Sequence, residues 1–224
     1  LEHLVKHANP QVIEAARQVT AQIGAAIDAV TSKAGANFDF VAYKRAVLAM
    51  IEKLAENPRA GAFIAELVGE DKPMMRHAGN VCVYSILMGL KLDFYLVKER
   101  SRLASPIAKD ISGLGVGTML LDVGMFRLEP PVLERYNATR DETDPAWREH
   151  TQLGFDMLKG DLDPAAAAVV LHHHQHYDGS GFPTRTDLAG KEVSLSGSDI
   201  HIFARIAMAA DLFDRLRHPA HVPG

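Results

Sequence analysis

Apolar residues recur at intervals of three and four along most of the chain, which is the spacing of an amphipathic helix. The first such segment begins at Pro10 and continues through Val30, and Gly35 marks its expected end. A second helix is expected over about residues 38–54, followed by a short third one to Val68. Further helices are expected near residues 74–90, 93–103, 106–120, 145–159, 164–175 and 202–217.

Signals for β-structure are weak. Residues 191–195 suggest a short extended piece, but no alternating run is long enough for a sheet. Residues 126–146 contain three prolines and form the main loop-rich interruption. The pattern therefore predicts an all-α fold, in which an N-terminal helical segment (1–68) precedes a second unit (69–224).

Composition and charge narrow the class of protein. The 224 residues, with 47% hydrophobic and 23% charged residues, are sufficient for one substantial core. A net charge of −4 without a long basic run argues against binding of a nucleic-acid polymer. No signal peptide and no apolar run of about 18 residues is present, so we expect no contact with a membrane. The single cysteine, Cys82, excludes an intramolecular disulfide and favours a cytoplasmic location. Because the chain starts at Leu1 and stops soon after Asp214, we expect a C-terminally truncated fragment.

Residues 172–183 combine four histidines and an aspartate with a glycine-rich turn. Imidazole is a common ligand for transition metals, so the cluster favours a metal site. The alternative is a solvated polyhistidine patch. The histidines close the apolar segment 165–171, where a buried helix would end and a pocket can form, and this position favours the metal site.

The same stretch resembles the signature of the HD-GYP family, bacterial metal-dependent phosphodiesterases that hydrolyse cyclic di-GMP. The matching residues are His173, His174, Asp178, Gly179, Gly181 and Pro183. Gln175 stands where the family has glutamate, and Phe182 stands where it has tyrosine. Four further segments are similar to family motifs in the same order, within residues 70–217: 77–81, 119–125, 150–154 and 204–214.

The resemblance implies an HD-domain helical bundle with an N-terminal helical extension, and it assigns roles to particular residues. The implied metal ligands are His77, Asp122, His150, His173, His174 and Asp211, of which Asp122 and His150 belong to the catalytic centre. The implied substrate contacts are His176, Asp178, Gly179, Gly181 and Asp214. In the family, two metal ions activate water for attack on phosphorus.

Three departures weaken the implied catalytic centre. Leu121 replaces the histidine of the family's His-Asp doublet, and Met125 replaces a lysine that approaches substrate phosphate. Pro73 replaces the glutamate of family members with a third metal. One subsite, formed by Asp122, His150, His173 and His174, keeps all its ligands, whereas the other, with His77, Asp122 and Asp211, lacks one. We therefore expect one or two transition-metal ions, for which iron, manganese and zinc suit the ligands equally.

Each ligand also has a structural interpretation. His77 could be a hydrogen-bonded core histidine, and His150 a surface residue near a helix start. Asp211 and Asp214 could simply pair with Arg205 or Arg215 on the same helix. The histidines that fit no motif are interpreted as solvated: His3, His7, His201, His218 and His221.

Two hypotheses for function remain. The first is a metal-dependent phosphohydrolase that acts on a cyclic dinucleotide or another phosphodiester with impaired turnover, as the departures at Leu121, Met125 and Gln175 suggest. The second is an inactive regulatory or binding module that keeps the fold. The N-terminal helices are interpreted either as a packing layer on the core or as a surface for homodimerisation.

Overall fold

The computed structural model describes residues 10–31, 40–61, 73–186 and 188–217, which are mostly helical, as the sequence predicts. The helices are α2 (Pro10–Thr31), α3 (Phe40–Glu56), α5 (Pro73–Lys91), α6 (Asp93–Glu99), α7 (Ser105–Lys109), α8 (Ser112–Met119), α9 (Pro130–Thr139), α10 (Pro145–Arg148), α11 (His150–Leu158), α12 (Pro164–His172) and α13 (Ile202–Arg217). The 3-10 helices are η1 (Pro58–Ala60), η2 (Val123–Arg127) and η3 (Gly197–Asp199), and one antiparallel ribbon joins β1 (Arg185–Thr186) to β2 (Glu192–Val193). The predicted all-α fold is confirmed.

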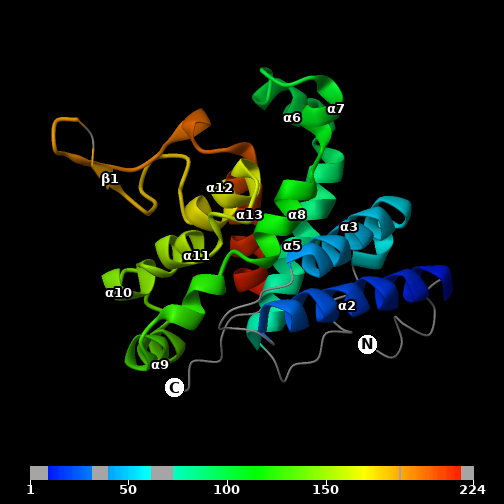
Figure 1. Cartoon of the computed structure of the whole chain (residues 1–224), viewed down its shortest axis with the longest axis horizontal. Coiled ribbons are helices and arrows are strands. Elements are labelled where there is room, and N and C mark those ends of the chain that lie inside the picture. Colours follow the sequence, from blue (N-terminus) through cyan, green and yellow to red (C-terminus); the bar gives the residue numbers. More distant parts are fainter. Residues whose placement is uncertain (1–9, 32–39, 62–72, 187, 218–224) are drawn as a thin grey trace.

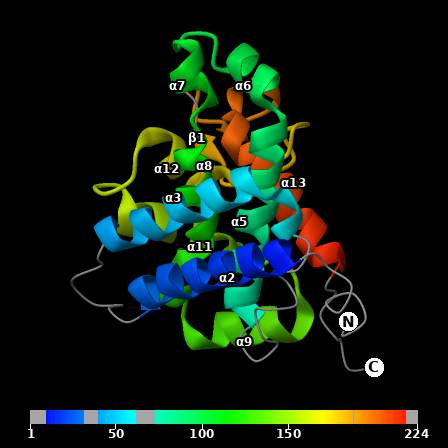
Figure 2. The ribbon, with the colours of Figure 1, turned by 90° about the vertical axis from the view of Figure 1, so that its right-hand side faces the viewer.

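The helices α5, α8 and α13 pack against one another at the centre of the molecule (Figure 1). Their apolar faces share one core, which includes the fully buried side chains of Ile86, Leu114 and Phe203. The helices α2 and α3 lie side by side and add Val19 and Tyr43 to the same core (Figure 2). The hydroxyl group of Tyr43 donates a hydrogen bond to a backbone carbonyl of α8 at 2.5 Å. The N-terminal helices are thus packed directly on the bundle that carries the candidate site.

Aspartates set where two of the helices begin. The carboxylate of Asp163 accepts hydrogen bonds from the backbone N–H groups of Ala165 and Ala166, at 2.9 and 3.0 Å. Asp144 caps α10 in the same way. These caps satisfy N–H groups that have no partner within the helix. The helix α12, which starts at this cap, ends at His172, directly before two of the predicted metal ligands.

The segment 126–146 is not the loop-rich interruption that the sequence pattern predicts, because it contains the ten-residue helix α9. Proline is accepted in the first turn of a helix, where its missing N–H group would have no partner. Pro130 and Pro131 therefore start α9 instead of preventing it. The helix ends at Thr139, because the next residue, Arg140, has a left-handed backbone (φ 53°) that cannot continue it. The prediction was wrong because it treated proline only as a helix breaker.

Two predicted helices are each divided in two. The helix predicted over 106–120 is broken at Asp110, where the backbone is extended. The Asp110 side chain accepts the N–H of Ser112 at 2.9 Å, and this local bond competes with the helical one. The helix predicted over 145–159 forms two pieces, α10 and α11, which meet at Glu149.

Three predictions fall outside the described residues. They are the end of the first helix at Gly35, the short third helix to Val68 and the boundary between residues 68 and 69. The division into two segments therefore stays a prediction.

Among the described residues, no single helix has the length and apolar composition needed to cross a membrane. Two sharply bent helix pairs pass that test only when their members are taken together. These are Arg76–Lys91 with Asp93–Glu99, and Ser105–Arg127 with Pro130–Thr139.

The packing of α8 on α12 yields a prediction for stability. A Cβ atom on Gly117 would lie 2.6 Å from Val169 Cβ and 2.8 Å from the carbonyl oxygen of Ala166. Gly117→Ala should therefore lower the free energy of unfolding by about 1–3 kcal/mol through overpacking. Gly24→Ala is the matched control, since a Cβ there meets nothing within 4 Å and should stabilise α2 by up to about 1 kcal/mol. Equal effects of the two changes in urea denaturation would contradict the observed packing.

Candidate metal centre

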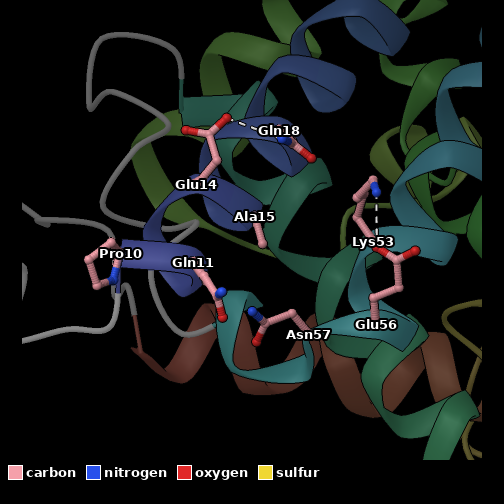
Figure 3. A pocket seen from close by; sticks show the side chains of 8 residues that line it. All are labelled: Pro10, Gln11, Glu14, Ala15, Gln18, Lys53, Glu56 and Asn57. Atoms are coloured by element: carbon pink, nitrogen blue, oxygen red, sulfur yellow. Dashed lines mark hydrogen bonds and ion pairs between the residues drawn. The ribbon is translucent and has the colours of Figure 1, made fainter.

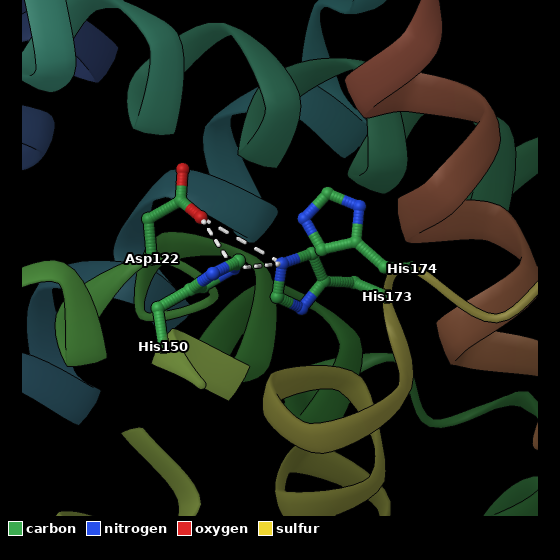
Figure 4. A group of neighbouring side chains, drawn as sticks. All are labelled: Asp122, His150, His173 and His174. Carbon is green, nitrogen blue, oxygen red and sulfur yellow. Dashed lines mark hydrogen bonds and ion pairs between the residues drawn. The ribbon is translucent and has the colours of Figure 1, made fainter. Parts of the chain in front are cut away.

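Four side chains from separate parts of the chain meet where η2, α11 and α12 come together (Figure 4). Asp122 lies between α8 and η2, His150 is the first residue of α11, and His173 and His174 follow α12 directly. One ligand atom from each of the four lies within 4.8 Å of the others. All three histidines are buried, and the Asp122 side chain is 17% exposed. These are the same four residues that the sequence groups into one subsite.

Two glycines allow the turn that carries Asp122 to approach α11. A Cβ atom on Gly124 would overlap with the carbonyl group of His150 and lie 2.5 Å from the backbone nitrogen of Gly154. Backbone atoms cannot move aside as a flexible side chain can, so only glycine fits there. The close approach leaves Asp122 Oδ1 3.5 Å from His150 Nε2.

The hydrogen bonds of the two deepest histidines fix which ring nitrogen carries the proton. Nδ1 of His150 is 2.8 Å from the carbonyl oxygen of Trp147, and Nδ1 of His173 is 3.0 Å from that of Val170. A carbonyl oxygen can only accept, so each neutral ring donates through Nδ1 and keeps a lone pair on Nε2. The two Nε2 atoms lie 3.4 Å apart, and Asp122 Oδ1 lies 3.5 and 3.6 Å from them. Three acceptors thus face one another without a proton to share, which is the arrangement that a bound cation stabilises.

The electrostatic environment keeps these groups in the protonation states that metal binding needs. Burial lowers the pKa of His150 to about 4, and it lowers the pKa of His174 well below its ordinary value. Burial alone would raise the pKa of Asp122, but the nearby histidines His150, His77 and His173 hold that pKa far below its usual range. Neutral imidazoles with one carboxylate suit iron, manganese or zinc. The donor set therefore fits a single transition-metal ion.

His77 on α5 connects this cluster to α13. Its Nε2 lies 3.1 Å from Asp211 Oδ1 and 3.6 Å from Asp122 Oδ2, while its Nδ1 lies 2.8 Å from Asp214 Oδ2. Burial acts to lower the pKa of His77, but hydrogen bonds to Asp211 and Asp214 and the charge of Asp122 raise it to about 10. The other oxygen of Asp214 accepts a hydrogen bond from Asn80 at 2.8 Å. Asp214, predicted as a substrate contact, is buried and lies against Nδ1 of His77, and its role toward substrate stays a prediction.

Two of the positions that depart from the family, Leu121 and Met125, lie in apolar surroundings. Leu121 is 1% exposed and packs with Val81 and Ala210, which lie on the same helices as His77 and Asp211. Met125 is buried in a second apolar cluster, whose other buried members are Leu128, Val132, Tyr136, Trp147 and Phe182. Neither side chain can supply a strong ligand or a positive charge.

The predicted substrate contacts at 176–181 form the turn after His174. The exposed His176 has Nδ1 3.0 Å from the hydroxyl of Ser180, and Asp178 accepts the backbone N–H and the hydroxyl of the same serine. Gly179 has a φ of +83°, and a Cβ atom on Gly181 would overlap with the backbone of 174–176. These residues shape the turn beside the cluster without joining it, so their role toward substrate stays a prediction.

Gln175 and Phe182 both support the cluster from outside. The ring of Phe182 stacks on His174, with centroids 4.6 Å apart and planes at 18°. The amide of Gln175 donates to the carbonyl of Pro183 at 2.5 Å, while its buried Oε1 has no partner within the described protein. Phe182 thus fixes a ring orientation that tyrosine would be expected to fix as well.

The remaining histidines lie apart from the cluster or outside the described residues. His201, interpreted as solvated, is half-buried, and its Nδ1 accepts the backbone N–H of Phe203 at the start of α13. That interpretation was wrong because the side chain caps a helix. The other four histidines without a motif, His3, His7, His218 and His221, lie outside the described residues.

Sequence reasoning missed three residues that hold the site together. Asn80 lies three positions after His77 on one helical face, so its spacing could have indicated a shared partner. Trp147 contacts the rings of both His150 and His174, and Glu142 pairs with Arg215. Trp147 lies three positions before His150, but no sequence spacing reveals its contact with His174 or the pairing of Glu142 with Arg215.

A separate hollow lies between the start of α2 and the end of α3 (Figure 3). Four of its polar side chains already pair with one another, Gln18 with Glu14 at 3.1 Å and Lys53 with Glu56 at 2.9 Å. Such self-paired, exposed groups leave little to bind a ligand, and none of the residues that line the hollow belongs to the histidine cluster.

Comparison with known proteins gives consistent results. A model of the HD domain matches residues 109–223. A cyclic di-GMP phosphodiesterase of Pseudomonas aeruginosa is 26% identical over 163 residues, which are 71% of this chain and 34% of that protein. The cyclic di-GMP phosphodiesterase response regulator RpfG of Xanthomonas campestris is 30% identical over 100 residues, or 43% of this chain and 24% of that protein. This chain thus spans about a third or less of the length of these relatives.

Two further matches concern substrate and fold. A 3'3'-cGAMP-specific phosphodiesterase of Vibrio cholerae is 31% identical over 100 residues, which are 43% of this chain and 17% of that protein. The solved structure of Bd1817, an HDG"Y"P protein from Bdellovibrio bacteriovorus, superposes with a TM-score of 0.64 and 18% identity. It covers 97% of this chain and 64% of the other, so the two share a fold.

The four-residue cluster predicts the metal content. Protein purified without chelator or affinity tag should contain about one transition-metal ion per chain by elemental analysis. His173→Ala removes one of the facing Nε2 ligands and should abolish that content. His201→Ala should leave it unchanged, because His201 lies outside the cluster. A pair of chelator-resistant metal ions per chain would contradict this assignment.

The raised pKa of His77 predicts how the stability of metal-free protein depends on pH. Folding favours the protonated imidazole, so the stabilisation is complete below the unfolded pKa of about 6.5 and is lost as pH rises through about 10. In urea denaturation of chelated protein, the free energy of unfolding should fall across this window more steeply for the wild type than for His77→Gln. Parallel pH profiles of the two proteins would show that His77 is not held as a cation.

Proposed function

Since the chain belongs to the HD domain family, we propose that it is a metal-dependent phosphohydrolase that acts on a cyclic dinucleotide or a related phosphodiester. The observation that carries the proposal is the group of three acceptors, His150 Nε2, His173 Nε2 and Asp122 Oδ1, that face one another within 3.6 Å. Related proteins named as cyclic di-GMP or 3'3'-cGAMP phosphodiesterases support this class of substrate.

The residues of the chain divide the work as follows. Asp122, His150, His173 and His174 hold an iron, manganese or zinc ion, with Asp122 and His150 at the catalytic centre. Bound there, the ion supplies a Lewis acid that lowers the pKa of water and screens phosphate charge.

Hydrogen bonds to the backbone keep the ligand side chains in place before substrate binds. The carbonyls of Trp147 and Val170 fix the ring tautomers of His150 and His173, so that Nε2 is always the ligand atom. Asp122 faces both His150 and His77. Its Oδ1 lies 3.5 Å from His150 Nε2, and its Oδ2 lies 3.6 Å from His77 Nε2. His77 and Asp211 form a second, weaker position.

The turn after His174 is proposed to receive the substrate. His176 and Asp178 are exposed beside the cluster, and Gly179 and Gly181 let the backbone pass close to it. We propose a cytoplasmic location, and pairing of two chains through the N-terminal helices, as properties that accompany this function.

An inactive regulatory or ligand-binding module is the second candidate. The apolar packing of Leu121 and Met125 favours it, because both positions have lost the groups that the resemblance assigns to catalysis. The intact cluster around His173 favours turnover. Incubation of manganese- or iron-loaded protein with cyclic di-GMP, with His173→Ala as the blank, separates the two. Hydrolysis that disappears in the variant supports the enzyme, whereas tight dinucleotide binding without product supports the module.

Restoration of the two lost groups should raise the rate. We expect Leu121→His with Met125→Lys, assayed at millimolar manganese, to hydrolyse cyclic di-GMP at least about tenfold faster than the parent, since that gain needs only about 1.4 kcal/mol in the transition state. The measurement is product formation followed by chromatography. No gain in a folded double variant that holds two metal ions would count against a dinucleotide phosphodiesterase and in favour of the regulatory module.

A further inference from the structure

The guanidinium group of Arg215 lies at the edge of the second position. Its Nη2 donates to Asp211 Oδ2 at 2.6 Å, and its Nη1 pairs with Glu142 on the segment between α9 and α10. The Arg215 side chain is 29% exposed, whereas that of Asp211 is only 3% exposed. A permanent positive charge therefore lies directly against a buried carboxylate that the sequence assigns to a metal.

Both oxygens of Asp211 already have donors from the protein. Oδ2 accepts from Arg215, and Oδ1 lies 3.1 Å from Nε2 of His77, whose Nδ1 is in turn held by Asp214. A guanidinium cannot be deprotonated in a protein, so this charge persists at every working pH.

The two halves of the site thus differ in how the charge of their carboxylates is balanced. Around His150 and His173, two ring nitrogens and Asp122 Oδ1 face one another, and no arginine or lysine of the described residues forms an ion pair with Asp122. Around Asp211 the protein supplies its own cation, and Leu121 packs its apolar side chain against Ala210 instead of providing a ligand.

We propose that Arg215 takes the electrostatic place of a second metal ion, so that the chain works with one metal and one fixed guanidinium. The inference rests on the proposed function, because it describes how the same site neutralises charge. Arg215 is a positioning residue: it holds Asp211 and repels any divalent ion from the second position. Glu142 anchors the far side of the guanidinium and keeps it directed at Asp211.

The test separates the effect of the Arg215 charge from the effect of the number of metal ligands. Metal-free protein carrying Leu121→His is combined with either Arg215→Gln, which keeps an amide donor near Asp211, or Arg215→Lys, which keeps the charge. Manganese binding is followed by calorimetry and by the electron paramagnetic resonance signal of free manganese. We expect the second manganese ion to bind at least about tenfold more tightly to the Gln variant than to the Lys variant, because a like charge a few ångströms away has been removed.

Arg217→Gln in the same background is the matched control, since Arg217 is exposed near the end of the same helix and should leave the second affinity unchanged. Equal second affinities in the Gln and Lys variants would overturn the proposal. If Arg215→Gln does not fold, Leu121→His alone decides: one tight manganese ion supports the proposal, and two contradict it. The readout is metal binding without substrate, so a failure to hydrolyse cyclic dinucleotides would leave this result intact.

Discussion

The geometry of the site depends on two neutral imidazoles and a carboxylate that face one another with no proton between them. His150 and His173 both donate their Nδ1 proton to a backbone carbonyl. Their Nε2 atoms therefore face each other with lone pairs, 3.4 Å apart and beside Asp122. Such an arrangement is costly in a buried environment unless a cation occupies it. The fold brings these three groups together through the positions where its helices start and through the close approach of Gly124 to the backbone of α11.

The same constraint explains why the site is asymmetric. The half formed by α11 and α12 provides acceptors alone, whereas the half formed by α5 and α13 pairs its carboxylates internally with His77 and Arg215. A site of this kind suits one tightly bound metal ion beside the guanidinium group of Arg215. Substitution at Leu121 fits this division, because an apolar side chain is tolerated only where no ion must be bound.

Much of this could be predicted from the sequence, and the remainder has physical reasons. Helical periodicity predicted the all-α fold, and the resemblance to the HD-GYP family implied that Asp122, His150, His173 and His174 form one group. Helix α9 was missed because Pro130 was treated as a breaker, although proline fits a first turn. The contact between Glu142 and Arg215 joins residues far apart in the chain, and no local pattern encodes it.

Anomalous X-ray diffraction from crystals grown with manganese tests the central claim most directly. The account predicts one strong anomalous peak within bonding distance of Asp122, His150, His173 and His174, with the guanidinium of Arg215 still on Asp211. Two peaks of similar height, one of them bound by His77 and Asp211, would contradict the single-metal account. The absence of any peak at the four-residue cluster would contradict the metal centre itself.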